Sequence, residues 1–131
     1  MKSNPLKFRK LLAAAKAAQH NAHAPYSKFR VGAALLTKSG KVYAGVNVEN
    51  ASYGLTNCAE RVAVGKAVSE GHRKFQAIAV VAPSTALSPC GACRQVLAEF
   101  GDCVVICADS RNTRRVRIHL LSELLPHTFK L

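Results

Sequence analysis

Residues 58–108 read CAERVAVGKAVSEGHRKFQAIAVVAPSTALSPCGACRQVLAEFGDCVVICA, and this stretch decides the fold. Two segments of helical character alternate in it with two short apolar runs typical of buried strands. Gly71 and Gly101 end the helical segments, because glycine is favoured where a helix stops. The elements expected here are a helix over 58–70, a strand over 76–82, a helix over 89–100 with Ser88 as its N-cap, and a strand over 103–108. Helices that alternate with strands are typical of an α/β domain.

The segments on either side of this stretch continue the alternation. The first is rich in Ala, Leu and Lys without Gly or Pro, which favours a helix. Two apolar runs follow it, joined at Ser39-Gly40 by a hairpin-type turn. The further elements expected are a helix over 6–19, strands over 31–37, 41–48 and 116–120, and a short helix over 121–125. This order predicts a single α/β domain over residues 1–131 with a mixed sheet.

The composition is typical of a folded domain and excludes a disordered or membrane-spanning chain. The 131 residues suit one domain, 49% of them are hydrophobic, and no apolar run reaches the roughly 18 residues needed to span a bilayer. Residues 1–5 lack the apolar segment of a secretory signal, so we expect a cytoplasmic protein with no membrane partner. Its five cysteines, an odd number, argue against a disulfide scaffold and favour metal binding or catalysis.

The charge of the chain is strongly positive. Nineteen Lys and Arg residues stand against seven Asp and Glu residues, which gives +12, and residues 1–48 hold nine basic residues and no acid. Such a charge permits attraction to phosphates, polymeric or small, but it also serves solubility. The charge therefore leaves a nucleic-acid partner open without indicating one.

The cysteine spacing points to a metal site. Cys90 and Cys93 form a C-x-x-C at an expected helix start, where the free backbone N–H groups favour thiolates. Alone, this pair fits a redox dithiol or half of a zinc site. Cys58 also lies at an expected helix start, so two facing helix starts could supply three thiolates to one ion and leave its fourth position open, as in catalytic zinc sites. Cys103 and Cys107 are interpreted as small hydrophobic residues of a buried strand.

The two residues after Ala59 have roles that depend on this metal site. Glu60 could accept a proton from water at the metal, although with Asn57 as N-cap it could equally form a capping box. Arg61 could donate hydrogen bonds to the thiolates and offset their charge, or it could be an ordinary exposed helix residue.

The motifs together resemble a known family. Residues 58–60 (CAE) followed by 89–93 (PCGAC) resemble the zinc deaminase signature, with Cys in place of the first His. Beyond the signature, residues 26–35 (YSKFRVGAAL), 47–54 (NVENASYG) and 89–97 (PCGACRQVL) are similar to the small homotetrameric cytidine deaminases. The combination spans about residues 25–99 and is highly specific.

The resemblance implies a role for each matched residue. For the metal centre it implies zinc ligands at Cys58, Cys90 and Cys93, a proton shuttle at Glu60, and an arginine bonded to the thiolates at Arg61. For the substrate it implies a ribose-binding pair at Asn47 and Glu49, a ring against the pyrimidine at Phe29, a backbone contact to the base at Ala59, and an aromatic reaching a neighbouring subunit's site at Phe129. Tyr53 is expected near the same subunit junction.

The resemblance also implies the fold and the activity. We expect a three-layer α/β/α fold with a mixed sheet of about five strands, one Zn²⁺ per chain, and a homotetramer. The expected reaction is zinc-dependent hydrolytic deamination of cytidine and 2′-deoxycytidine, small-molecule pyrimidine nucleosides, to uridine and 2′-deoxyuridine plus ammonia, which belongs to pyrimidine salvage.

Deaminases with other substrates are the nearest alternatives. A blasticidin-type deaminase, acting on a modified cytosine nucleoside, is less favoured because Asn47 and Glu49 suit a ribose. A deaminase of cytosine in RNA or DNA is less favoured because the chain has only eight aromatic residues and no Trp for stacking. The basic residues that would support that second alternative are Arg111, Arg114, Arg115 and Arg117.

Two alternatives do not involve catalysis. One is a zinc-binding or redox module built on Cys90 and Cys93, which would work without Glu60. The other is a nucleic-acid-binding protein that relies on charge alone, whose binding would fall steeply with salt.

Overall fold

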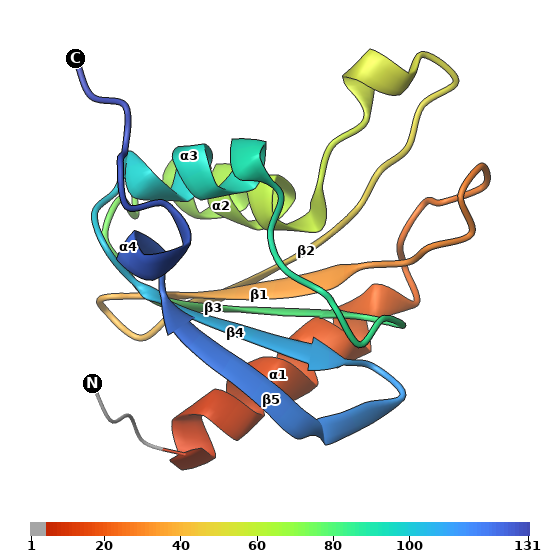
Figure 1. Ribbon diagram of the computed structural model, residues 1–131, viewed down its shortest axis with the longest axis horizontal. Helices are drawn as coiled ribbons and strands as arrows, with labels where there is room; N and C mark the ends of the chain where they lie inside the picture. Colours follow the sequence, from red (N-terminus) through yellow and green to blue (C-terminus); the bar gives the residue numbers. More distant parts are fainter. Residues whose placement is uncertain (1–4) are drawn as a thin grey trace.

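The computed structural model describes residues 5–131, and the first four residues, which belong to the segment examined for a signal, lie outside it. Its sheet has five strands in the order β2-β1-β3-β4-β5 (Figure 1). The strands are β1 (Gly32–Thr37), β2 (Val42–Val46), β3 (Phe75–Ala82), β4 (Val104–Asp109) and β5 (Asn112–Leu120). Only the β3–β4 pair is parallel among these neighbours, so the expected mixed sheet is confirmed.

Helices cover both faces of this sheet and form the expected three layers. The helices are α1 (Pro5–Gln19), α2 (Ala59–Ser69), α3 (Gly91–Ala98) and the short α4 (Leu121–Leu124), with a 3-10 turn η1 at Tyr53–Leu55. Figure 1 shows α1 on one side of the sheet and α2 with α3 on the other. One apolar cluster joins the sheet to α1 through Leu11 and Ala15, and another joins it to α2 and α3 through Ala63 and Leu97.

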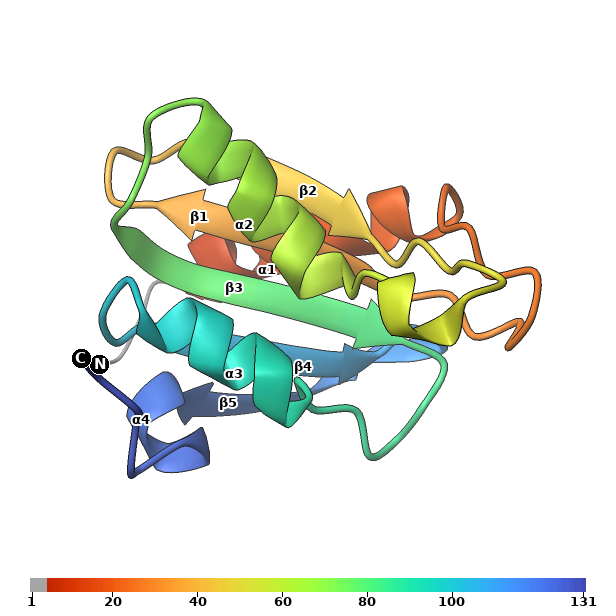
Figure 2. The same cartoon turned by 90° about the horizontal axis from the view of Figure 1, so that it is seen from above.

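The topology brings the starts of α2 and α3 to the same edge of the sheet. Parallel strands need a crossover, and α3 provides it between β3 and β4. Figure 2 shows that both helices begin near the carboxyl end of β3 and run back across the sheet. Residues 32 positions apart in the sequence therefore meet at two neighbouring helix N-termini.

Glycine at position 45 lets α2 lie directly on β2. A Cβ at Gly45 would be 2.4 Å from the carbonyl oxygen of Ala59 and 2.6 Å from the backbone nitrogen of Ala63. Because both atoms belong to the helix backbone, no side-chain rotation could relieve the contact. The absence of a side chain at Gly45 thus fixes how closely the first turns of α2, and the residue before them, approach the sheet.

Three element boundaries differ from the expectations. α3 begins at Gly91 with Cys90 as N-cap, so Ser88 is not the cap; its hydroxyl instead accepts a bond from Arg94. The second strand ends at Val46, where the chain leaves the ladder. β5 starts at Asn112 and not at residue 116, because the Asp109–Asn112 pair extends the ladder past a register shift between Ala108 and Asp109.

Within residues 5–131, no helix combines the length and apolar character required to cross a membrane.

Candidate active site

Three cysteine sulfurs meet where α2 and α3 begin. Cys58 is the N-cap of α2, Cys90 is the N-cap of α3, and Cys93 lies in the first turn of α3. The Cys58 and Cys90 sulfurs are 3.9 Å apart, those of Cys90 and Cys93 are 3.4 Å apart, and all three lie within 4.8 Å of one another. Among residues 5–131 this is the one group of three or more potential ligands close enough to hold an ion.

The arrangement of the sulfurs fits zinc. Ligand sulfurs at about 2.3 Å from a tetrahedral zinc ion would lie roughly 3.8 Å from each other, close to the two separations observed here. Thiolates are the soft ligands that zinc accepts, and three of them leave one position open. The C-x-x-C is thus not an isolated dithiol, because Cys58 completes a three-sulfur site.

Arg61 brings a positive charge into contact with one of the sulfurs. Its Nη2 donates to the Cys58 sulfur at 3.3 Å, whereas its Nε is buried with no hydrogen-bond partner in the described chain. Hydrogen bonds from Cys93, and then from Arg61, lower the pKa of the Cys58 thiol to about 5. The pKa of Cys93 is raised because its thiol donates to Cys58 and because it is buried. The surroundings thus favour a thiolate at Cys58, the charge state that binding to a metal requires.

Cys103 and Cys107 do not belong to this centre. Both are buried in the apolar cluster between the sheet and the helices α2 and α3. Burial raises the pKa of Cys103 to about 12 and that of Cys107 to about 11. The interpretation of these two cysteines as small hydrophobic residues is confirmed.

Glu60 is a buried carboxylate beside the three sulfurs. It lies in the first turn of α2 with a side chain only 5% exposed. Burial, and then the nearby charge of Cys58, raise its pKa to about 7. The capping box with Asn57 is wrong, because the N-cap of α2 is Cys58, which makes no side-chain cap bond. Glu60 is therefore available for chemistry.

Asn47 fixes the backbone that precedes β1. Its Oδ1 accepts from the Val31 N–H at 2.9 Å, and its Nδ2 donates to the Phe29 carbonyl at 2.8 Å. The side chain is 8% exposed, so these bonds are made in a largely dry environment. Asn47 keeps one amide hydrogen and one acceptor lone pair for a further partner.

Glu49 lies two residues further and holds the turn over residues 24–27. Its carboxylate accepts from the backbone N–H groups of Tyr26 at 3.0 Å and Ser27 at 3.2 Å, and from the Ser27 hydroxyl. The Ser27 hydroxyl is the main reason that the pKa of Glu49 is lowered. A cavity of about 440 Å³ opens here, lined by Tyr26, Ser27, Glu49, Asn50, Tyr53 and Thr56.

The matched aromatic residues are not part of the core of this chain. Tyr53 is 76% exposed, Phe129 is 69% exposed, and Phe29 is 37% exposed. The Tyr53 ring meets that of Tyr26 edge-to-face, with centroids 6.2 Å apart. Phe129 is held through its backbone by the amide of Gln95, which donates to the Phe129 carbonyl at 3.1 Å. Ordinary core packing does not account for these rings.

Arg94 is an important residue that the sequence did not single out. Its guanidinium donates to the Pro89 carbonyl, the Leu124 carbonyl and the Ser88 hydroxyl, each at 2.8 Å. It thus ties the segment before Cys90 to α4. The spacing contained no signal for this contact, since Leu124 lies 30 residues along the chain.

Comparisons with known proteins agree with this geometry. Residues 7–109 match the family model of the cytidine and deoxycytidylate deaminase zinc-binding region. The chain is 50% identical to a protein named "Probable cytidine deaminase" from Dictyostelium discoideum over 129 residues, 96% of this chain and 86% of that one. It is 60% identical to a cytidine deaminase of Sporosarcina psychrophila over 92 residues, 70% of this chain and 68% of that one.

The fold is also found in a solved structure of the same kind. The crystal structure of a cytidine deaminase from Burkholderia pseudomallei superposes with a TM-score of 0.88 at 50% identity. The match covers 92% of this chain and 98% of that one.

Proposed function

The chain belongs to the cytidine and deoxycytidylate deaminase family, and on that premise we propose that it deaminates free cytidine and 2′-deoxycytidine. Water replaces the 4-amino group, which gives uridine or 2′-deoxyuridine and ammonia. The observation that carries the proposal is the meeting of three cysteine sulfurs with the buried carboxylate of Glu60 at two helix N-termini. Pyrimidine salvage in the cytoplasm is the setting that such a reaction suits.

Cys58, Cys90 and Cys93 would hold one zinc ion per chain. When bound, zinc would supply the Lewis acidity that activates water for attack on C4 of the base. Three thiolates would leave Zn²⁺ with a net charge of about −1, which weakens that effect. Arg61 donates to the Cys58 sulfur and so draws part of the negative charge away from the metal.

Glu60 moves the protons of the reaction. Its carboxylate accepts a proton from the attacking water and delivers it to N3 of the pyrimidine, which makes C4 more electrophilic. The carboxylate then takes the remaining proton of the water from the hydroxyl group now on C4 and gives it to the amino nitrogen, which leaves as ammonia. The position of Glu60, two residues after one ligand and in the first turn of α2, supports this role because it keeps the carboxylate beside the metal site.

The substrate's ribose and base are bound by residues around Asn47. Asn47 and Glu49 meet the ribose, chiefly its 3′-hydroxyl, because the amide can donate to a free hydroxyl and the carboxylate can accept from it. The negative charge of Glu49 would repel a phosphate at that position, which favours nucleosides over nucleotides. Phe29 packs against the pyrimidine, and the Ala59 backbone at the start of α2 contacts the base.

Four copies of the chain complete the site. Tyr53, Leu55 and Phe129 are each at least 65% exposed in the single chain, an unfavourable state for large apolar side chains. A homotetramer would cover them, with Phe129 reaching a neighbour's site and Tyr53 at the subunit junction. Light scattering at several protein concentrations tests the assembly.

The proposed activity is tested with free cytidine. Conversion to uridine is followed by the loss of ultraviolet absorbance, with zinc measured on the same sample; the expected result is turnover with one zinc per chain. Glu60→Gln should keep zinc and lose nearly all turnover, whereas the exposed Glu70→Gln at the other end of α2 should change neither. Full activity of Glu60→Gln, or no conversion by a zinc-loaded protein, would overturn the proposal.

A further inference from the structure

A cavity that does not include the three cysteines lies beside β5, an edge strand of the sheet. It has a volume of about 570 Å³ and is formed between β5 and the loop over residues 83–88. The hydroxyl, amide, guanidinium and carboxyl side chains that line it are Ser84, Thr85, Asp109, Asn112, Arg114, Arg115 and Arg117. The size falls within the range of small-molecule sites.

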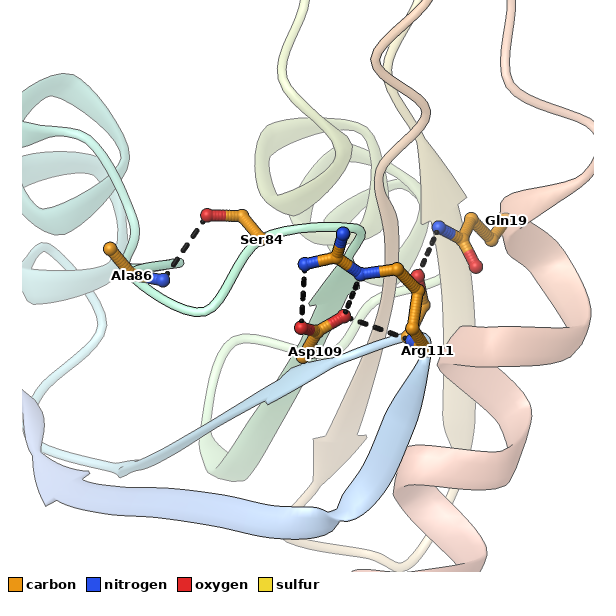
Figure 3. A network of polar contacts seen from close by, with 6 residues as sticks. Gln19, Ser84, Ala86, Asp109 and Arg111 are labelled. Atoms are coloured by element: carbon orange, nitrogen blue, oxygen red, sulfur yellow. Dashed lines mark hydrogen bonds and ion pairs between the residues drawn. The ribbon is translucent and has the colours of Figure 1, made fainter.

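The walls of this cavity are held in place by a polar network (Figure 3). The Ala82 carbonyl accepts from the N–H groups of both Ser84 and Ser110, which joins the loop to the turn between β4 and β5. Ser84 Oγ accepts from the Ala86 N–H at 3.2 Å, and Gln19 of α1 donates to Ser110 Oγ at 3.0 Å. The cavity is therefore largely formed before any ligand enters.

The cavity carries an excess of positive charge. Its one acid, Asp109, is already engaged, because Arg111 donates Nε–H to Oδ1 and Nη2–H to Oδ2, both at 2.9 Å. This pair lowers the pKa of Asp109 and keeps it ionised. In the part of the chain that the structure describes, the guanidinium groups of Arg114 and Arg115 meet no carboxylate.

The positive charge extends around the edge strand. Arg117 donates to the Leu87 carbonyl, which directs its guanidinium towards the loop that borders the cavity. Arg114 also lines a neighbouring cavity of about 480 Å³ between α1 and β5, where Arg9 and Lys16 join it. The described residues that line this second cavity include no acid. Five cationic side chains thus line two adjoining cavities, and the one carboxylate among the described residues that line them, Asp109, is paired with Arg111.

Arginine guanidinium groups bind phosphate oxygens in pairs of parallel hydrogen bonds, and the hydroxyls of Ser84 and Thr85 add further donors. No aromatic residue is among the described side chains that line either cavity, so there is no surface on which nucleic-acid bases could stack. We infer that the cavity bordered by Arg114, Arg115 and Arg117 binds a small anion with several linked phosphates, inorganic or as the phosphate chain of a nucleotide. The ordinary alternative is that these charges only protect an edge strand from pairing with another chain.

Inorganic triphosphate is the probe, titrated into the zinc-loaded protein by calorimetry at low ionic strength. We expect one triphosphate per chain and an affinity that falls as salt rises. Arg114→Gln combined with Arg115→Gln should weaken binding by about tenfold for each arginine lost. The matched control, Arg73→Gln with Lys74→Gln, removes the same charge just before β3 and should leave the affinity within about twofold.

A variant with more positive charge at the cavity should bind triphosphate more tightly. Asp109→Asn keeps a side-chain oxygen for the Arg111 N–H but removes the negative charge and frees the guanidinium, so triphosphate should bind several-fold more tightly. ATP that binds like inorganic triphosphate would support the proposal and identify a nucleotide as one source of the phosphate chain.

Three outcomes would overturn the inference. The first is no binding of triphosphate at millimolar concentration. The second is equal weakening by the control pair and by the cavity pair, which would indicate nonspecific attraction. The third is a single-stranded oligonucleotide that binds far more tightly than triphosphate, with an affinity that grows with its length. Because binding is measured directly, none of these outcomes depends on whether the chain deaminates cytidine.

Discussion

A methyl group at position 45 should separate the cysteine ligands without touching any of them. In Gly45→Ala the new Cβ would lie 2.4 Å from the Ala59 carbonyl oxygen, against an ordinary contact distance of at least 3.4 Å. The first turn of α2 must therefore retreat by about 1 Å, the difference of the two distances. Cys58 precedes Ala59 directly and moves with it, whereas Cys90 and Cys93 belong to α3 and stay in place.

This displacement has two measurable consequences. Overpacking of this kind costs about 1–3 kcal/mol of the free energy of unfolding, which urea denaturation measures. Zinc tolerates ligand distances only within about 0.2 Å, so the affinity for zinc, measured against a chelating dye, should fall at least about tenfold.

Gly65→Ala is the matched control because it makes the same change in the same helix. A Cβ there meets no atom within 4 Å, so this variant should keep its zinc affinity and become about 0.5–1 kcal/mol more stable. Gly45→Ala that retains both the stability and the zinc affinity of the parent chain, or Gly65→Ala that loses zinc equally, would contradict this prediction.

Three further predictions concern residues around the centre. Arg94→Gln removes the hydrogen bonds to Pro89, Leu124 and Ser88 and should lower the free energy of unfolding by roughly 2–4 kcal/mol. A chelator should also extract zinc faster from this variant. An unchanged free energy of unfolding and an unchanged extraction rate would show that the three bonds are dispensable. At pH 8, after zinc removal, iodoacetamide should modify Cys58 and Cys90 well before Cys103 and Cys107, because burial raises the pKa of Cys103 to about 12 and that of Cys107 to about 11. Mass spectrometry of peptides measures the order of modification. Equal rates at the four cysteines would contradict the prediction. The pKa of Glu49 is lowered from 4.5 chiefly by the Ser27 hydroxyl, so ionised Glu49 stabilises the folded chain above pH 4.5, and this stabilisation is lost as the pH falls through the lower pKa of the folded state. Glu49→Gln should therefore remove this pH-dependent part of the urea midpoint. A variant whose urea midpoint depends on pH as that of the parent chain does would contradict the prediction.

The regular elements could be predicted because their signals are local. The apolar runs at 76–82 and 103–108 and the glycines that follow the helices lie in the sequence itself, and the strands and helix ends fall close to them. The predicted start of α3 is wrong because Ser88 and Pro89 resemble a cap and a first turn, whereas the hydroxyl of Ser88 accepts a hydrogen bond from Arg94. A local pattern cannot show that a distant side chain competes for a cap.

The same distinction applies to the candidate site. The cysteine group could be predicted because each sulfur lies at a helix start that the sequence marks, and the topology then brings the starts together. The bond between Ser27 and Glu49 spans 22 residues, and that from Arg94 to Leu124 spans 30, without any periodic signal. Such contacts depend on how loops pack against distant parts of the chain. The spacing of residues in the sequence does not indicate that packing.

The position of Cys90 depends on the segment just before it, which two arginines hold from different elements. Arg117 of β5 donates to the Leu87 carbonyl, and Arg94 of α3 donates to the Pro89 carbonyl. Each bond satisfies a backbone oxygen that the loop itself leaves unpaired, so the loop has little freedom to move away from α3. Cys90 is therefore positioned by bonds that do not involve a metal ion. Because Leu87 also lines the cavity of the proposed phosphate site, the segment that leads to Cys90 forms part of its wall, and the two proposed sites share this segment.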